Sequence, residues 1–184
     1  MRLYLVRHPK PVVAPNTCYG RSDLVVAPDE LARVAAAVLP LLPTGTPLFS
    51  SPLRRCAELA QRLAAPLACG PVLFDQRLAE IDFGAWEERC WDAIARAEVD
   101  AWADDLVGYR PGGGESVLQM AQRVRAFHAE LRQSAQECAI VVCHAGTIRL
   151  LLAQRDGLSL PQMAWQAARA AHGIDYGAVI TLDC

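Results

Sequence analysis

The stretch LYLVRHPKP, residues 3–11, places an unbroken apolar run directly before an arginine and a histidine. A short continuous apolar run is typical of a strand that is buried on both faces of a parallel sheet. The pattern recurs at residues 139–142, where AIVV is followed by Cys143 and His144. We therefore predict two inner strands, each followed closely by a histidine.

Shorter apolar or β-branched runs predict three further strands, at residues 47–49, 72–74 and 178–182. Between the strands lie segments with apolar residues at helical spacing. We expect helices at residues 29–38, 53–63, 116–127 and 147–155. Ser116 and Gln119 form a capping box at the start of the third helix. This alternation predicts an α/β fold, a three-layer αβα sandwich with a mainly parallel sheet, in one domain over residues 1–184.

Composition narrows the class of protein. A formal net charge of −2 gives no reason to expect binding to nucleic acid or to a membrane surface. Seven scattered cysteines without a C-x-x-C pair suggest neither a zinc site nor a disulfide framework, and they fit reduced thiols in a cytoplasm. No basic leader precedes an apolar stretch, and no apolar run is long enough to span a bilayer. We expect a cytoplasmic protein that acts on a small molecule, and the sequence leaves the oligomeric state open.

Polar residues collect just after the predicted strands, where open parallel sheets bind their ligands. Arg7 and His8 follow the first strand, SPLRR at residues 51–55 follows the second, and His144 follows residues 139–142. One histidine at a strand end is more often structural than catalytic, but several arginines beside two histidines suit an oxyanion. Because no carboxylate cluster accompanies them, we predict a phosphate site without a metal ion.

The sequence lacks the motifs that are typical of several common types of enzyme. The chain has no G-x-S-x-G elbow, no G-x-x-x-x-G-K-[ST] loop, no G-x-G-x-x-G after a strand and no H-E-x-x-H. What remains is a nucleophile, phosphate-binding cations and an acid, which suit phosphoryl transfer through a covalent enzyme intermediate. We therefore expect no cofactor.

These motifs resemble those of the histidine phosphatase superfamily, also known as the phosphoglycerate mutase-like family. Arg7-His8 matches its strand-end pair, and SPLRRC at residues 51–56 matches its Ser-x-Leu-x-Arg-Ala pattern. LAEIDFGAWE at residues 78–87 matches Leu-x-Glu-x-x-x-Gly-x-Trp-Glu, and residues 144–146 match its second histidine. With the Gly-Glu-Ser triplet at residues 114–116 as a further family feature, the resemblance spans residues 3 to about 155.

The resemblance implies a phosphomonoester hydrolase that forms a phosphohistidine. It implies that His8 attacks phosphorus and that Glu80 protonates the leaving alkoxide and later activates water. It implies that Arg7, Arg55 and His144 bind the phosphate oxygens, with Ala145 as a further substrate contact. Pro11 and Ala14 stand where the family commonly has polar residues, and we expect Lys10 and Arg21 to substitute for them as phosphate or substrate contacts. The family usually has glycine after its Arg-His pair, where this chain has Pro9.

Two features favour one branch of the family. At 184 residues the chain has little room for the insertions and the tail of the mutases, which favours a phosphatase. Residues 12–24 are similar to the bacterial α-ribazole phosphatase branch, which acts on a nucleotide-like phosphate in late cobalamin assembly. α-Ribazole 5′-phosphate is therefore a candidate substrate, with mutase-type or broad small-molecule phosphatase activity as alternatives.

Two further alternatives stay open. Residues 143–149 fit C-x-x-G-x-x-R, the phosphate loop of cysteine-dependent phosphatases, which would make Cys143 the nucleophile. Pro9 suggests instead a protein that binds a phospho-ligand but turns it over poorly. We also expect residues 88–115 to roof the pocket. Trp91, Trp102 and Trp165 are expected to be core or lid residues. His128 and His172 are expected to be structural or solvated.

Overall fold

The computed structural model describes residues 1–154, 157–170 and 173–184. Within these ranges one sheet has the strand order β3-β2-β4-β1-β5. Its strands are β1 (Arg2–Arg7), β2 (Leu48–Ser50), β3 (Leu73–Phe74), β4 (Cys138–Cys143) and β5 (Val179–Asp183). Strands β1 to β4 run parallel, and β5 pairs antiparallel with β1 at one edge. The prediction of a mainly parallel sheet is confirmed.

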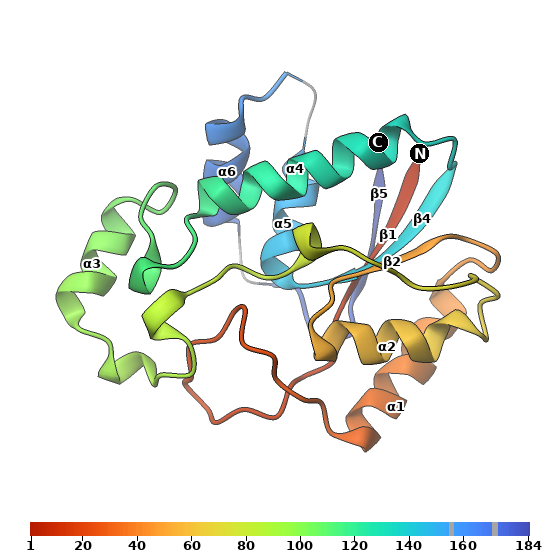
Figure 1. The fold of residues 1–184 in the computed structure, drawn as a ribbon, viewed down its shortest axis with the longest axis horizontal. Helices are drawn as coiled ribbons and strands as arrows, with labels where there is room; N and C mark the ends of the chain where they lie inside the picture. The colour runs from red at the N-terminus through yellow and green to blue at the C-terminus, as the bar shows by residue number, and fades with distance from the viewer. Residues whose placement is uncertain (155–156, 171–172) are drawn as a thin grey trace.

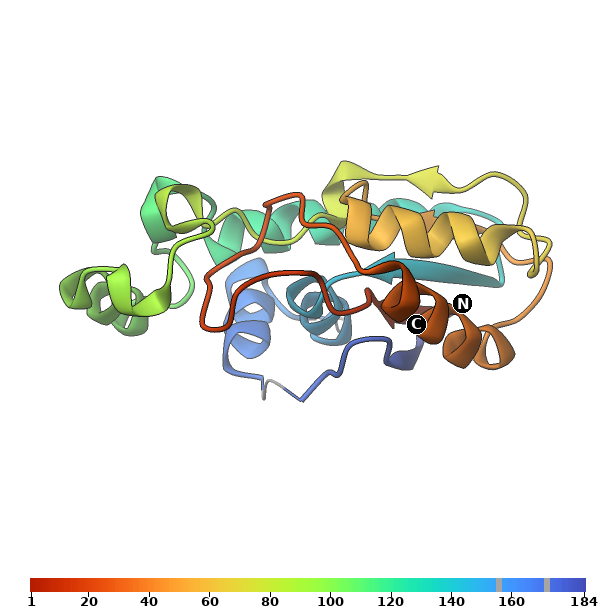
Figure 2. The ribbon, with the colours of Figure 1, turned by 90° about the horizontal axis from the view of Figure 1, so that it is seen from below.

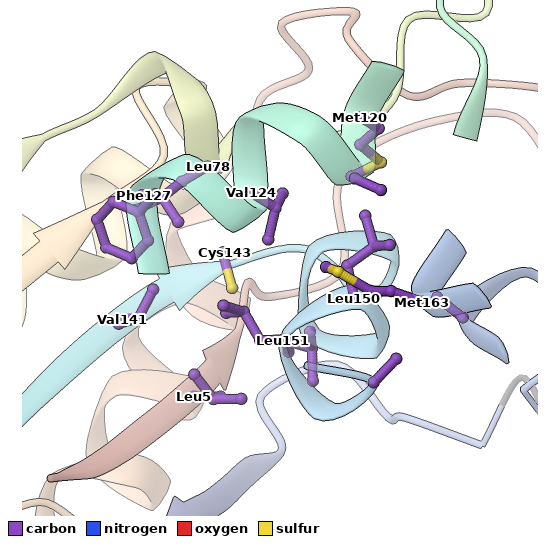
Figure 3. Packing of buried hydrophobic residues seen from close by; sticks show 14 of the residues in the cluster. Leu5, Leu78, Met120, Val124, Phe127, Val141, Cys143, Leu150, Leu151 and Met163 are labelled. Atoms are coloured by element: carbon purple, nitrogen blue, oxygen red, sulfur yellow. The ribbon is translucent and has the colours of Figure 1, made fainter. Parts of the chain in front are cut away.

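Helices cover both faces of the sheet and complete three layers (Figure 1). On one side lie α1 (Pro28–Val38) and α2 (Arg54–Ala64). On the other lie α4 (Val117–Gln133), α5 (Ala145–Leu152) and α6 (Leu160–Arg169). Successive residues of β1 point to opposite faces of the sheet. Leu5 packs in the hydrophobic cluster with α4 and α5, and Val6 packs in the cluster with α1 and α2. Figure 3 shows part of the first cluster. The predicted αβα sandwich is confirmed.

Helices α1 and α2 lie within one residue of their predicted bounds, whereas α4 begins as predicted and continues to Gln133. The capping box at Ser116 is present with both of its hydrogen bonds. Helix α5 begins at Ala145, two residues before the predicted start, and the predicted end at Arg155 lies outside the described residues. Two helices were not predicted, α3 (Arg96–Asp104) and α6. Helix α3 has no fully buried residue, and its apolar face is limited to Val99 and Trp102, which pack against a small cluster around Trp86. This pattern is too short to predict a helix. Short 3₁₀ turns occupy residues 39–41, 76–78, 84–86, 91–93 and 111–113.

The segment that carries α3 projects from one end of the molecule, clear of the three layers (Figures 1 and 2). Backbone hydrogen bonds tie its base to the loop after β1. Cys18 N–H donates to the Arg89 carbonyl at 2.8 Å, and Trp91 N–H donates to the Asn16 carbonyl at 2.9 Å. Two segments far apart in the sequence thus form one wall. In the described part of the chain, no helix is long and apolar enough to cross a membrane.

Candidate active site

The sheet register brings the two predicted catalytic histidines together. Arg7 pairs with Cys143 across β1 and β4, so the next residues along both strands, His8 and His144, are also neighbours. His8 N–H donates to the Cys143 carbonyl at 3.1 Å, and the two imidazole rings are 5.0 Å apart between centroids. Both side chains are buried. Parallel pairing of two inner strands therefore places one histidine directly beside the other.

His8 has a defined tautomer. Its Nδ1 lies 2.7 Å from the Pro9 carbonyl oxygen, which can only accept a hydrogen bond, so Nδ1 carries the proton. Burial, followed by the positive charge of Arg55, holds the pKa of His8 well below its ordinary value. The ring is therefore neutral at neutral pH and Nε2 keeps its lone pair. Pro9 is compatible with this arrangement because it contributes its carbonyl group.

Two arginines supply positive charge next to His8. Arg55 is fully buried and donates to the carbonyl oxygens of Gly20 and Ser22, while Arg7 donates to the Ile174 carbonyl. The Nε atoms of Arg7 and Arg55 are buried and have no hydrogen-bond partner among the described residues. A buried N–H without a partner is costly, so these two donors indicate a place for an anion.

Glu87 organises the loop that holds Arg55. Its carboxylate accepts the backbone N–H groups of Gly20 at 3.0 Å, Arg21 at 2.8 Å and Ser22 at 3.1 Å. Although partial burial raises the pKa of Glu87, the Ser22 hydroxyl and these N–H groups outweigh it and lower the pKa below its ordinary value. The sequence motif contained Glu87, but nothing in the sequence indicated this role.

The side chain of Glu80 contacts the first turn of α5. Its carboxylate accepts the N–H of Gly146 at 2.9 Å and the N–H of Ile81 at 3.1 Å. A Cβ at position 146 would lie 2.3 Å from Glu80 Oε1, so glycine is required for this approach. Arg123 fixes the backbone of this segment, because it donates to the Glu80 carbonyl at 3.1 Å and pairs with Glu115 at 2.7 Å.

His144 contacts two side chains that follow β2. Its Nε2 lies 2.8 Å from Ser51 Oγ and 3.4 Å from Cys56 Sγ. Burial, followed by the charge of Arg55, holds the pKa of His144 well below its ordinary value. Burial raises the pKa of Cys56, so the group beside the imidazole is a neutral thiol. Cys56 stands where the family pattern has alanine, and Ser51 is a site contact that the sequence did not single out.

A largely apolar cavity of about 390 Å³ lies beside Glu80 and Gly146. Its aromatic lining comes from Tyr19, Phe83, Trp91 and Trp102. Trp91, Trp102 and Leu106 confirm that part of residues 88–115 roofs the pocket, and they agree with the core-or-lid prediction for the two tryptophans. Trp165 on α6 is 52% exposed, so it is not a core residue.

The remaining predicted contacts lie around this centre. Ala145 is the first residue of α5, next to His144. Arg21 is exposed and its guanidinium lies 3.8 Å from the Asp82 carboxylate. Lys10 lines a second hollow, of about 520 Å³, which Tyr176 also borders. His128 is buried within α4, and His172 lies outside the described residues.

Cys143 belongs to the hydrophobic core. Figure 3 shows its side chain among Leu5, Val124 and Leu151, and the residue is fully buried. Burial raises the pKa of Cys143 well above its ordinary value, so its thiol stays protonated. A protonated thiol in the core is not a nucleophile. The geometry therefore favours His8 over Cys143.

The strand ends of this α/β sheet bring together two neutral histidines, the buried Arg55 and the half-buried Arg7. Such a site can hold an oxyanion beside a nitrogen nucleophile. The family model of the histidine phosphatase superfamily (branch 1) matches residues 3–175. The chain belongs to this superfamily and is an enzyme of the phosphomonoesterase type. The resemblance expected from the sequence motifs is confirmed.

Individual relatives agree with the family. A protein of Erwinia tasmaniensis named "Probable phosphoglycerate mutase GpmB" is 30% identical over 165 residues, which cover 86% of this chain and 76% of that protein. The α-ribazole phosphatase of Shigella flexneri has a TM-score of 0.80 at 25% identity, covering 100% of this chain and 90% of that one. A mycobacterial glucosyl-3-phosphoglycerate phosphatase has a TM-score of 0.79 at 26% identity, covering 99% and 89%.

Proposed function

We propose that the protein is a metal-independent phosphomonoester hydrolase that works through a phosphohistidine at His8. Its preferred substrate carries an aromatic group on the leaving alcohol, and α-ribazole 5′-phosphate is the leading candidate. The observation that carries this proposal is the histidine pair at the strand ends together with the aromatic cavity that Glu80 lines.

The first chemical step follows from the tautomer of His8. Its Nε2 lone pair attacks phosphorus, the P–O bond to the alcohol breaks, and Glu80 gives its proton to the departing oxygen. Arg7 and Arg55 meet the phosphate oxygens with the donors that otherwise lack partners. In the second step a water molecule, deprotonated by Glu80, attacks phosphorus and releases inorganic phosphate and His8. The low pKa of His8 keeps the nucleophile neutral before the attack.

The cavity wall supports an aromatic leaving group over a small acidic one. Four aromatic side chains line it, and in the described part of the chain Arg149 is the one cationic side chain on its wall. Its volume of about 390 Å³ is within the usual range for small-molecule sites. A phosphorylated sugar acid, such as the substrates of the mutases, carries a carboxylate as well as the phosphate, and a wall that is mostly apolar and aromatic suits such a charged group poorly. The α-ribazole phosphatase among the structural neighbours is consistent with this choice.

The test is phosphate release with a chelator present, from α-ribazole 5′-phosphate, 3-phosphoglycerate and p-nitrophenyl phosphate. The wild type should release phosphate from α-ribazole 5′-phosphate with the highest kcat/KM, and His8→Ala should abolish release from every ester. An alkaline quench after mixing with ³²P-labelled ester should trap a phosphoenzyme in the wild type only, and the label should then be lost on exposure to acid.

Cys143→Ala is the matched control for the nucleophile. It should retain activity, because the thiol lies in the core and away from the reacting atoms. Loss of activity in a folded Cys143→Ala protein with retention in His8→Ala would overturn the assignment. Preference for 3-phosphoglycerate would reject the aromatic substrate, and tight binding of esters without phosphate release would favour a binding protein.

A further inference from the structure

Tyr176 lies against the guanidinium group of Arg7. The Cζ atom of Arg7 is 3.9 Å from the centroid of the Tyr176 ring, a separation at which a cation and an aromatic face attract. The residues that follow Tyr176 also form backbone hydrogen bonds with the end of β1. Arg7 N–H donates to the Ala178 carbonyl at 3.0 Å, and Gly177 N–H donates to the Arg7 carbonyl at 3.1 Å. The guanidinium itself donates to the Ile174 carbonyl, so one short segment contacts both ends of this arginine.

The Tyr176 ring is itself held in place. Its hydroxyl lies 2.6 Å from the hydroxyl of Tyr19, which belongs to the loop after β1 and lines the aromatic cavity. The ring centroid of Tyr176 is 5.6 Å from that of His8. Tyr176 therefore touches Arg7 on one side and the nucleophile on another, while Tyr19 links it to the wall of the leaving-group cavity.

We propose that Tyr176 is a positioning residue that holds Arg7 for phosphate binding, an inference that rests on the proposed function. Stacking limits rotation of the guanidinium plane, and the Ile174 carbonyl occupies one of its terminal N–H groups. The buried Nε has no partner among the described residues, so its N–H is available to an anion. An arginine that is already oriented loses less conformational entropy when phosphate binds.

The test measures the dissociation constant of inorganic phosphate by calorimetry, and kcat and KM for p-nitrophenyl phosphate. Tyr176→Leu removes the ring and should raise the Kd for phosphate about tenfold, which corresponds to about 1.4 kcal/mol and lies between the values for exposed and desolvated cation–aromatic pairs. Tyr176→Phe keeps the ring and should stay within about threefold of the wild type. Tyr19→Phe removes the other hydroxyl of the Tyr19–Tyr176 contact. Its Kd for phosphate should therefore be similar to that of Tyr176→Phe.

Two controls separate positioning from general stability. Trp165→Leu removes another arginine–aromatic stack, in which Arg169 lies 4.8 Å from the exposed Trp165 ring of α6, and should leave the phosphate Kd unchanged. In an Arg7→Lys background the planar group is gone, so Tyr176→Leu should then change the Kd by less than about threefold. If Tyr176→Leu does not fold, Tyr176→Met gives the same comparison with a flexible apolar side chain.

The outcomes separate this inference from the proposed function. A Tyr176→Leu protein that binds phosphate as tightly as the wild type overturns the inference, whatever its catalytic rate. An equal loss in the Arg7→Lys background also overturns it, since the effect would not pass through Arg7. If the wild type hydrolyses no ester but shows the expected phosphate affinities, the function fails and the positioning role stands.

Discussion

The carboxylate of Glu80 accepts the backbone N–H of Gly146 at 2.9 Å, at the first turn of α5 and beside the apolar cavity. In the proposed mechanism this carboxyl group gives its proton to the alcohol oxygen of the ester. Glu80→Gln keeps the shape of the side chain but removes the acid, so kcat for an alkyl phosphate should fall by about 10²–10⁴-fold. p-Nitrophenyl phosphate, whose leaving group needs no proton, should be affected far less.

Glu130→Gln is the matched control for this change, because Glu130 pairs with Arg77 on the exposed side of the protein. It should leave turnover of both esters unchanged. Equal losses on the alkyl and the nitrophenyl ester in Glu80→Gln would contradict a role in protonating the leaving group.

Gly146→Ala should displace Glu80 without removing it. The new Cβ would lie 2.3 Å from Oε1, so the carboxylate must move away from α5. Turnover of alkyl phosphates should fall about tenfold or more, since general acid catalysis depends on hydrogen-bond distance. Affinity for inorganic phosphate should change little. Gly173→Ala, where a Cβ meets nothing within 4 Å, is the control in the same assays; equal effects of the two substitutions would count against the displacement.

The sequence predicted the centre of the site better than its surroundings. Arg7, His8 and His144 come at the ends of apolar strands. Because neighbouring parallel strands end at the same edge of the sheet, residues at those ends lie close together. Tyr176 was missed because it lies in an irregular segment whose position depends on β5 pairing antiparallel with β1. The one available signal was its place just before the last predicted strand.

Contacts within long loops were equally beyond prediction. Glu87 binds the backbone of residues 20–22, and that contact depends on how two loops pack rather than on any periodicity. Tyr19 reaches the cavity for the same reason. Local patterns predict elements and strand ends, whereas the walls of a pocket are set by tertiary contacts between irregular segments.

Glu87→Gln should disturb Arg55 from a distance. A carboxylate that accepts several N–H groups is replaced by an amide with one acceptor oxygen and a donor, which leaves N–H groups of residues 20–22 unpaired. We expect a loss of about 2–3 kcal/mol in the free energy of unfolding and weaker phosphate binding. Denaturant titration and calorimetry measure the two effects.

Glu58→Gln provides the comparison for Glu87→Gln. Glu58 pairs with Arg54 one turn away on the outer face of α2, and an exposed pair of this kind contributes at most about 1 kcal/mol. If Glu87→Gln matches Glu58→Gln in its free energy of unfolding and in its Kd for phosphate, the loop does not depend on the Glu87 carboxylate.

Buried neutral histidines should make folding sensitive to acid. The pKa values of His8 and His144 are well below the ordinary value of about 6.5 that the unfolded chain has. Below that pH the unfolded state takes up protons that the folded state does not, so the free energy of unfolding falls as pH falls. Above about pH 6.5 both states are neutral at these positions and the contribution is complete. Each histidine adds a slope of up to about 1.4 kcal/mol per pH unit.

Urea unfolding of the wild type and His8→Gln, in phosphate-free buffer between about pH 8 and pH 5.5, measures this contribution. The variant lacks one of the two groups, so its stability should decline less steeply below about pH 6.5. Carboxylates that titrate in the same range are common to both proteins and cancel in the comparison. Parallel curves would mean that His8 accepts a proton in the folded state as readily as in the unfolded chain, and the neutral nucleophile would then be lost at mildly acidic pH.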